Sequence, residues 1–429
     1  MGKILYICLA VLLMMGTMPV CGQNASEPML VEGYYQIENA EQLMWFRDQV
    51  NRSTEVDTDQ DFTISRLNAR LMADIDLSGT ESWVPIGNYN TGINNHEYAG
   101  TFDGQGHVIS GLTVEEIPGR ISYGLFGYVW KGTVKNLGIV NSTIKGTEYV
   151  GSICGMLGNG TIDNCFSSAS VMASADGARV GGLSGRLRKT SVIENSYNAG
   201  PVTATGGKDG YTDASGSYGP VAPSVGGIDG YIGSESIVMK NCFNVGKISA
   251  SFDKANIGGI AGDDYGGNST YVLKATDDTE EGRILNSYYL EGTGTGKQAK
   301  ALSASDFVTT INSQLFAGAN DYWQGTASLA NGLLSIPTFE SGKPVQVSVS
   351  SGDPTAIEKT TNDVNRIRTL NGCICIDVSV SMNMRIVSIT GRTVRTGRLS
   401  AGSNEIADLP VGVYIVILDN GMRSKVMIR

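Results

Sequence analysis

Histidine, proline and charged residues are all scarce in this chain. Its 429 residues include 2 His and 11 Pro, and only 17% are charged, whereas 41% are hydrophobic. That balance supplies a sizeable core and excludes both an intrinsically disordered chain and long charged helices. Lys and Arg number 32 against 42 Asp and Glu, a net charge of -10. Because this sign is wrong for contacts with phosphate backbones, nucleic acid is not an expected partner.

The familiar catalytic motifs are also missing. His96 precedes Glu97, but no second His follows at zinc-protease spacing. No G-x-S-x-G elbow, P-loop or dinucleotide fingerprint occurs in a fitting context. Asp57, Asp59 and Asp61 alternate like the start of a calcium loop, but Phe62 stands where that loop needs Gly. We therefore assign no catalytic residue, no metal and no cofactor.

Other carboxylates give weak signals. Asp74 and Asp76 share a strand face and are expected to be turn or cap residues. Asp103 and His107 form an acid and base pair within a Gly-rich turn, a pattern that does not require catalysis. The acidic stretch 263–281 is expected to be a solvated insertion.

The first 22 residues have the form of a signal peptide. Lys3 precedes an apolar run over residues 4–15, Pro19 ends it, and cleavage after Gly22 leaves no further apolar stretch long enough to cross a membrane. Acylation at Cys21 is the alternative. We expect a secreted or surface protein.

Removal of the signal leaves an odd number of cysteines. An odd number does not make a disulfide framework, and a domain of this size has core enough without bridges. These residues are expected to be free thiols: Cys154, Cys165, Cys242, Cys373 and Cys375.

Glycine, by contrast, is abundant at 56 residues, and much of it recurs at fixed places. A pattern of an apolar residue, Gly, two or three residues and a final Gly occurs at 123–127, 150–155, 180–185, 225–230 and 257–262. Each copy is followed by an Asn, giving a unit near 30 residues with two units lengthened by insertions. The five repeat positions are Asn136, Asn164, Asn195, Asn241 and Asn286.

Such a unit holds short β-type runs and cannot bury its own face. Stacked coils can, at about 4.8 Å spacing, so the period predicts a parallel β-solenoid. Ile162, Asn164 and Phe166 share strand parity, which predicts inward aliphatic and aromatic columns and a ladder of Asn amides. A Gly bend would let residues three apart both pack inward, so Gly182, Gly227 and Gly259 should resist substitution far more than Gly216 in an insertion.

These motifs, with residues 71–77, 83–87 and 98–107 before them, resemble the GLUG-repeat proteins of bacterial surfaces. The resemblance covers residues 30–340, with the repeats at about 123–290. It implies an all-β, right-handed β-helix-like solenoid in an exported, adhesin-like protein and implies no activity.

Short helices are expected to cap both ends of this solenoid. Asn39 and Gln42 form a capping box before an apolar stripe of Leu43, Phe46 and Val50. Ser303 or Ser305 opens a second helix whose Phe307, Ile311 and Leu315 would cover the last coil, with Trp323 and a strand over 334–339 completing it.

Composition changes after the solenoid. Residues 341–363 have the composition of a linker, and 364–429 contain short alternating strands typical of a small β-sandwich. Residues 389–392, 409–414 and 425–429 resemble the C-terminal sorting domain of the type IX secretion system. The resemblance implies export across the outer membrane of a Gram-negative bacterium, with the export machinery as a partner.

Two insertions are the expected binding regions. The loop 206–223 carries Tyr211 and Tyr218, and the loop 263–282 carries Tyr265 and Tyr271, among Gly and polar residues. We expect a non-enzymatic, adhesin-like protein that presents these loops to a glycan or a host or matrix protein. The alternative is a polysaccharide lyase or glycoside hydrolase on a β-helix scaffold.

Overall fold

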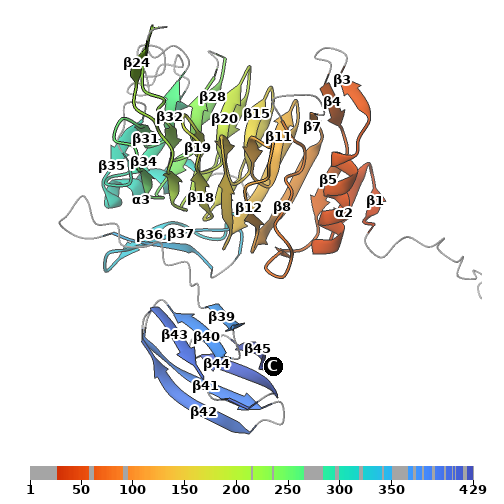
Figure 1. The fold of residues 1–429 in the computed structure, drawn as a ribbon, viewed down its shortest axis with the longest axis vertical. Coiled ribbons are helices and arrows are strands. Elements are labelled where there is room, and N and C mark those ends of the chain that lie inside the picture. Colours follow the sequence, from red (N-terminus) through yellow and green to blue (C-terminus); the bar gives the residue numbers. More distant parts are fainter. Residues whose placement is uncertain are drawn as a thin grey trace, which may run out of the picture.

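A computed structural model gives the fold of the chain (Figure 1). It describes residues 27–57, 62–89, 95–213, 216–233, 236–264, 284–294, 299–317, 322–340, 343–349, 366–370, 373–378, 381–388, 392–400, 402–407, 409–410, 412–418 and 423–428. The signal-like segment 1–22 lies outside these residues.

The body of the molecule is a parallel β-solenoid of about seven turns, as the repeats predicted. Each complete turn passes through four faces, which we number in chain order. The first face holds β1 (Met29–Val31), β2 (Tyr34–Ile37), β5 (Asn68–Leu71), β6 (Ile75–Asp76), β8 (Thr101–Ser110), β12 (Thr133–Val140), β16 (Thr161–Asp163), β17 (Phe166–Ser167), β21 (Val192–Glu194), β22 (Tyr197–Asn198), β28 (Val238–Lys240), β29 (Phe243–Asn244), β33 (Ile284–Leu285), β34 (Tyr288–Leu290) and β35 (Lys300–Leu302).

The other three faces are shorter. The second face holds β9 (Thr113–Val114), β13 (Thr143–Gly146), β18 (Ser170–Ala173), β23 (Val202–Ala204) and β30 (Ile248–Ala250). The third face holds β10 (Ser122–Tyr123), β14 (Tyr149–Val150), β19 (Arg179–Gly181), β26 (Ser224–Gly226) and β31 (Asn256–Gly258). The fourth face holds β3 (Glu55–Asp57), β4 (Phe62–Ser65), β7 (His96–Tyr98), β11 (Phe126–Trp130), β15 (Cys154–Gly158), β20 (Ser184–Arg188), β27 (Asp229–Ile232) and β32 (Ala261–Asp264).

Aliphatic columns fill the inside of the coils. Equivalent residues of successive turns are direct register partners, so one buried side chain stacks on the next. Stacking of like side chains buries apolar area at every step and needs only that each coil keep the same residue class. One such column consists of Val134, Ile162, Ile193, Met239 and Ile284, all fully buried.

The repeated asparagines stabilise the coils from a left-handed backbone conformation. Asn136 lies within β12, the other four lie between two short strands of the first face, and all five have a positive φ of 46–54°. Asn164 Nδ2 donates to Asn136 Oδ1 at 2.8 Å, and Asn241 Nδ2 donates to Asn195 Oδ1 at 3.0 Å. Asn195 instead donates to Asp163 Oδ1 at 2.9 Å, so the predicted amide ladder is present but interrupted between Asn164 and Asn195.

The left-handed asparagine reverses the side-chain alternation of the strand, so residues of the same parity before and after it point to opposite sides of the sheet. Ile162 before Asn164 points into the core, whereas Phe166 after it belongs to a separate cluster outside the coil. The prediction that the aromatic column faces inward is therefore wrong, because strand parity does not continue through a left-handed turn. Phe166 and Tyr197 stack with ring centroids 5.2 Å apart, and Phe243 continues the outer column.

The segment after the coils covers this outer aromatic column. Helix α3 (Ala304–Gln314), capped by Ser303, places Phe307 against Phe243, and Trp323 packs on both Phe166 and Tyr197. The antiparallel strands β36 (Ser328–Ala330), β37 (Leu333–Ile336) and β38 (Val345–Ser348) complete the cover and run beneath the coils in Figure 1.

Two boundary expectations change accordingly. Phe307, Ile311 and Leu315 pack on the side of the solenoid with the outer aromatics and not over the axial core. Strand β38 lies inside the segment 341–363 predicted to be a linker, and its Val345 and Val347 are buried against β37, so the linker prediction is wrong for residues 345–348.

The N-terminal helix α2 (Ala40–Asn51) forms as predicted. Asn39 Oδ1 accepts from the Gln42 N–H at 3.0 Å, and the Gln42 side chain accepts from the Glu38 N–H at 2.7 Å. Leu43, Phe46 and Val50 are fully buried in the coil core. The helix lies beside the first coils (Figure 1).

The C-terminal segment is a β-sandwich, as predicted. One sheet contains β39 (Arg366–Leu370), β40 (Cys373–Val378) and β43 (Gly402–Ile406), and the other contains β42 (Thr393–Leu399), β41 (Met382–Ser388), β44 (Gly412–Leu418) and β45 (Arg423–Ile428). Ile374 and Ile376 of the first sheet share a core with Ile386 and Val416 of the second.

Cys154, Cys165 and Cys242 are buried free thiols, as expected, whereas Cys373 and Cys375 are half-buried. In the part of the chain that the structure describes, no helix is long and apolar enough to cross a membrane.

The Gly pair has a packing reason that goes beyond a bend. Val180 and Leu183, on either side of it, both point into the core, as predicted. A Cβ at Gly182 would overlap the Asn198 amide and the carbonyl oxygen of Gly227 in the next coil. Asn198 itself is buried inside the solenoid, where its Nδ2 donates to Asn244 Oδ1 at 2.9 Å.

Gly182→Ala should therefore destabilise the solenoid by about 3 kcal/mol or more, because the new methyl group has only backbone and a buried amide to displace. Gly219→Ala is the matched control, since a Cβ there meets nothing within 4 Å, and its effect should stay within about 0.5 kcal/mol. Urea unfolding of both variants measures the difference. Equal effects would show that the coil assignment is wrong.

Candidate functional site

The first candidate site is a hairpin inserted between the second and third faces. Strands β24 (Tyr211–Asp213) and β25 (Gly216–Tyr218) pair antiparallel, with Tyr211 opposite Tyr218. The side chain of Tyr218 is 45% exposed. In Figure 1 this hairpin projects beyond the edge of the coils near β32. Sequence reasoning placed a loop at 206–223, and the structure shows it to be partly folded.

The base of the hairpin is fixed to the coils. The Gly207 N–H donates to Asp176 Oδ1 at 2.9 Å in the preceding coil, and Lys208 and Val221 exchange backbone hydrogen bonds. Lys254 of the following coil forms an ion pair with Asp209. These contacts hold the first end of the insertion to the turns on either side and pair it with the second end. Tyr265 and Tyr271, predicted in the second insertion, lie outside the described residues.

The second candidate is an arginine and tyrosine cluster where the third and fourth faces meet. In four of the five repeat motifs, a Cβ on the last Gly would overlap backbone atoms of the third face, so the two faces come together there without side chains between them. These four are Gly155, Gly185, Gly230 and Gly262. Side chains beside this line of contact therefore gather at one corner. We call Tyr149, Arg179, Arg186 and Tyr231 the arginine–tyrosine corner.

Two guanidinium groups in this corner share two tyrosine rings. Arg179 lies 4.4 Å from the Tyr231 centroid and 5.6 Å from that of Tyr149, and Arg186 lies 5.6 Å from both. Each guanidinium also donates to the Tyr149 hydroxyl, at 3.3 and 3.4 Å. Tyr149 is buried, while both arginines and Tyr231 are half-buried. The arginine positions are thus set by stacking on the rings.

The corner continues along the fourth face. Tyr128, Met156, Arg186 and Tyr231 occupy one row of successive coils. Two residues further along β20, Arg188 donates to the Tyr128 hydroxyl at 3.4 Å. Sequence reasoning missed this site, although residues 179–189 contain four cationic residues and no carboxylate in a chain of net charge -10. That run was the available signal.

The predicted acid and base pair is rearranged. His107 Nδ1 lies 3.0 Å from Asp74 Oδ1 and not beside Asp103, and both Asp103 and His107 belong to the strand β8 and not to a turn outside it. Asp103 accepts from Asn136 Nδ2 at 2.8 Å and lies 3.3 Å from Lys135 Nζ, so it begins the asparagine ladder. Asp76 accepts from the Ser78 N–H, the expected turn role.

Asp57 does not stand as the first ligand of a calcium loop. It is buried, accepts from Trp130 Nε1 at 3.1 Å and pairs with Lys131 Nζ at 2.9 Å. Asp59 and Asp61 lie outside the described residues. Within the described ranges, no three His, Cys, Asp or Glu side chains gather as a metal site.

Two buried carboxyl groups have raised pKa values. Glu97 on β7 is fully buried, and neither of its oxygens has a hydrogen-bond partner among the described atoms. Desolvation, with a smaller contribution from the charge of Asp57, raises the pKa of Glu97 to about 8. Asp229 lies inside the coils in register with Ser184, and burial raises its pKa well above the ordinary range.

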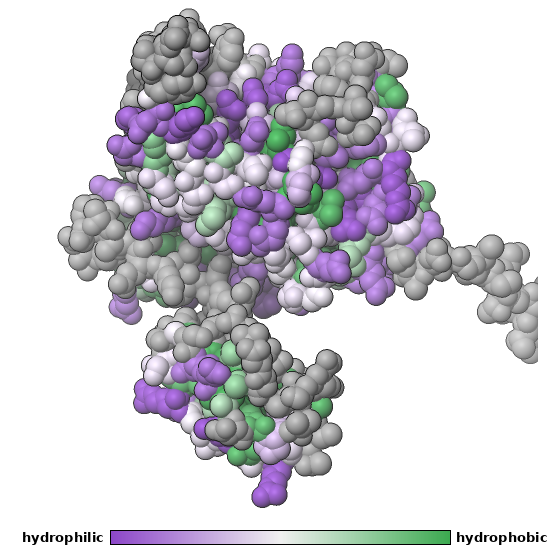
Figure 2. Space-filling model, viewed as in Figure 1, coloured by the Kyte–Doolittle hydropathy of each residue, from purple (hydrophilic) through white to green (hydrophobic). Residues whose placement is uncertain are grey.

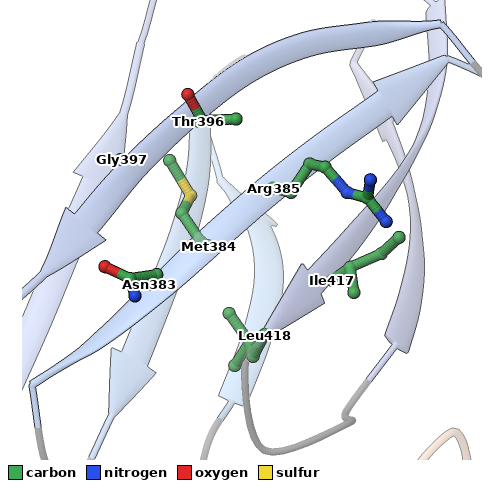
Figure 3. A pocket seen from close by; sticks show the side chains of 7 residues that line it. All are labelled: Asn383, Met384, Arg385, Thr396, Gly397, Ile417 and Leu418. Carbon is green, nitrogen blue, oxygen red and sulfur yellow. The ribbon is translucent and has the colours of Figure 1, made fainter.

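The C-terminal sandwich carries one open hollow of about 510 Å³ on its four-stranded sheet. In Figure 3, Met384 points toward Gly397 and Thr396, whereas Arg385 and Ile417 lie on the other side of the strand. The lining holds one charged side chain and no acid, so the described residues supply no catalytic group there. Figure 2 shows hydrophobic residues across this sandwich, while hydrophilic residues are prominent on the solenoid.

Comparison with known proteins places few constraints on function. No family model matches the chain. A stretch of 137 residues is 33% identical to halomucin of Haloquadratum walsbyi, which covers 30% of this chain and only 1% of that protein. The chain thus spans about 1% of the length of this relative.

A solved structure from Bacteroides ovatus, provisionally named an immunoglobulin A1 protease, aligns with 68% of this chain and 89% of its own. The two are 21% identical, and the TM-score is 0.44. The resemblances to GLUG-repeat proteins and to the type IX sorting domain thus rest on the sequence motifs alone.

The buried Glu97 should make stability depend on pH. Its carboxyl ionises near 4.5 in the unfolded chain and near 8 in the folded chain, so the folded state binds more protons between these values and stability falls as pH rises from about 4.5 to about 8. Glu97→Gln should stabilise the chain at pH 8 by on the order of 2–4 kcal/mol, and the gain should vanish toward pH 4.5. Thermal melting across this range tests it; a gain that did not change with pH would contradict it.

Proposed function

We propose that this chain is a secreted or surface-displayed binding protein that presents the hairpin β24–β25 to a glycan or protein partner. The observation that carries the proposal is a connection lengthened without disturbing the coils. The link between the second and third faces uses residues 205–223, where the preceding coil uses only 174–178. The flanking strands keep their register, with Val171 opposite Val202 and Val180 opposite Val225.

An insertion of this kind costs the scaffold little and adds surface. Loop closure entropy grows slowly with length, and the anchoring contacts of Asp176 and Lys254 limit the freedom of the base. The exposed ring of Tyr218 offers large contact area with few rotatable bonds. A rigid solenoid that carries such an element is a typical arrangement for partner binding.

A place outside the cell is the second part of the proposal. The signal-like residues 1–22 support it, and so does the similarity of part of the chain to halomucin. The motifs of the C-terminal sandwich favour delivery by a type IX system in a Gram-negative bacterium, with the export machinery as a partner of that domain.

Binding is favoured over polysaccharide cleavage by the state of the nearby acids. A lyase or hydrolase needs an accessible carboxyl group beside its substrate. On the fourth face Glu97 is buried, and Asp263 accepts from Asn256 Nδ2 at 2.9 Å. Asp263, which lies in register with Tyr231 one coil further on, is half-buried and is thus the acid that a cleavage mechanism at the corner would have to use, although a neutral amide already donates to it.

Replacing residues 205–223 by the five residues 174–178 should remove partner binding and preserve the fold. The coils before and after keep their register with the short connection, so the melting temperature should change by only a few degrees. Binding to immobilised glycans and matrix proteins, measured on an array, should fall at least tenfold.

Tyr218→Ala should reproduce much of this loss, since a central exposed tyrosine is worth about 1–2 kcal/mol in many interfaces. Val394→Ala, at an exposed position of the sandwich, is the control and should bind normally. Unchanged binding after the hairpin replacement would rule out the hairpin as the contact surface.

A further inference from the structure

We propose that the arginine–tyrosine corner is a second binding site, specific for a carboxylate-bearing polysaccharide whose uronate groups the guanidinium groups of Arg179 and Arg186 bind. This inference rests on the proposal that the chain is a binding protein, but not on the hairpin. The corner belongs to the third and fourth faces, whereas the hairpin leaves the solenoid between the second and third.

The two guanidinium groups are held ready for a ligand. Stacking on Tyr149 and Tyr231 fixes their planes, so little side-chain entropy is lost when a ligand binds. A guanidinium has five N–H donors, and the hydrogen bond of each side chain to the Tyr149 hydroxyl uses only one. The remaining donors can bind a carboxylate in the two-pronged geometry that Arg favours.

Within the described ranges, no ion pair neutralises the positive charge of the corner. Among the described residues, no carboxylate lies within ion-pair distance of Arg179, Arg186 or Arg188. The acid that interacts electrostatically with Arg186 is Asp229, and burial inside the coils raises the pKa of its carboxyl group well above the ordinary range. Stacked cations without a counter-ion in an acidic protein are unfavourable alone and become favourable with an anionic ligand.

The accessible part of the site spans two adjacent coils. Arg179, Arg186 and Tyr231 are half-buried and lie one coil spacing apart, roughly 5 Å along the solenoid axis, whereas Tyr128 and Met156 of the same row are fully buried. Such a site fits the carboxylates of one or two neighbouring sugar units of a chain. Nucleic acid fits poorly, because the net charge of -10 repels a dense phosphate chain outside this one coil. An added peptide strand also fits poorly, because β20 is already paired on both sides by β15 and β27.

Titration calorimetry at low salt with a hexamer of galacturonic acid tests the site on the full chain. The fully methyl-esterified hexamer is the matched ligand, because it keeps the sugar backbone and loses the charge. The acid hexamer should bind, the ester should bind at least tenfold more weakly, and raised salt should weaken only the acid.

The double substitution Arg179→Gln and Arg186→Gln should weaken binding of the acid hexamer at least tenfold. Arg392→Gln with Arg398→Gln removes the same charge from exposed positions of the sandwich and should have no effect. Arg179→Lys with Arg186→Lys keeps the charge without the fork and should give an intermediate loss. If the double Gln substitution lowers the melting temperature, its loss of binding could come from unfolding. The double Lys substitution, which keeps the charge, and the ester ligand, which is tested on the unsubstituted protein, then still decide the question.

Three results would overturn the inference: equal binding of acid and ester, full affinity in the Gln pair, or equally tight binding of a short DNA duplex. The hairpin replacement should leave hexamer binding intact. If the protein binds other ligands on the array but not the acid hexamer, the second binding site is refuted and the proposed function stands. If the protein binds no ligand at all, both proposals are refuted.

Discussion

The rest of the fold depends on one backbone constraint, the left-handed asparagine repeated in the first face. A positive φ costs conformational free energy in any residue other than glycine. Asparagine is among the residues with the smallest cost, because its side-chain amide can form local hydrogen bonds. Here the amide bonds from coil to coil, for example from Asn164 to Asn136. The turn also sends aliphatic residues such as Ile162 inward and aromatic residues such as Phe166 outward. The solenoid therefore has one core inside and a second one outside.

The outer core explains why the chain does not end with its coils. Without a cover, the outer aromatic column of Phe166, Tyr197 and Phe243 would be a continuous apolar patch exposed to water. Patches of this kind are rare on protein surfaces unless another element or a partner covers them. Helix α3 and the sheet β36–β37–β38 supply that cover, and the Tyr197 hydroxyl donates to the Pro337 carbonyl oxygen at 2.8 Å. Because β38 pairs with β37 to complete this covering sheet, residues 345–348 belong to the cover and not to the linker.

Sequence reasoning predicted what repeats in every coil and missed what occurs once. The period, the Gly pair at Gly182, the helix cap at Asn39 and the β-sandwich all follow from local patterns. The direction of Phe166 did not, because nothing in strand parity reports that Asn164 has a positive φ. The arginine–tyrosine corner was missed because its four residues come from three coils, and only the register of those coils brings them together.

A repeating scaffold also limits where a specific function can arise. Inward positions must stack on the same class of residue above and below, and the Gly positions admit no side chain, so neither can vary without loss of the fold. Outward positions and connections carry no such constraint. The corner at Arg186 and the hairpin after β23 are both departures from the repeat at unconstrained positions. Arg186 stands where the neighbouring coils have Met156 and Tyr231, so the row itself does not require a cation at this position, and the proposed binding role would account for it.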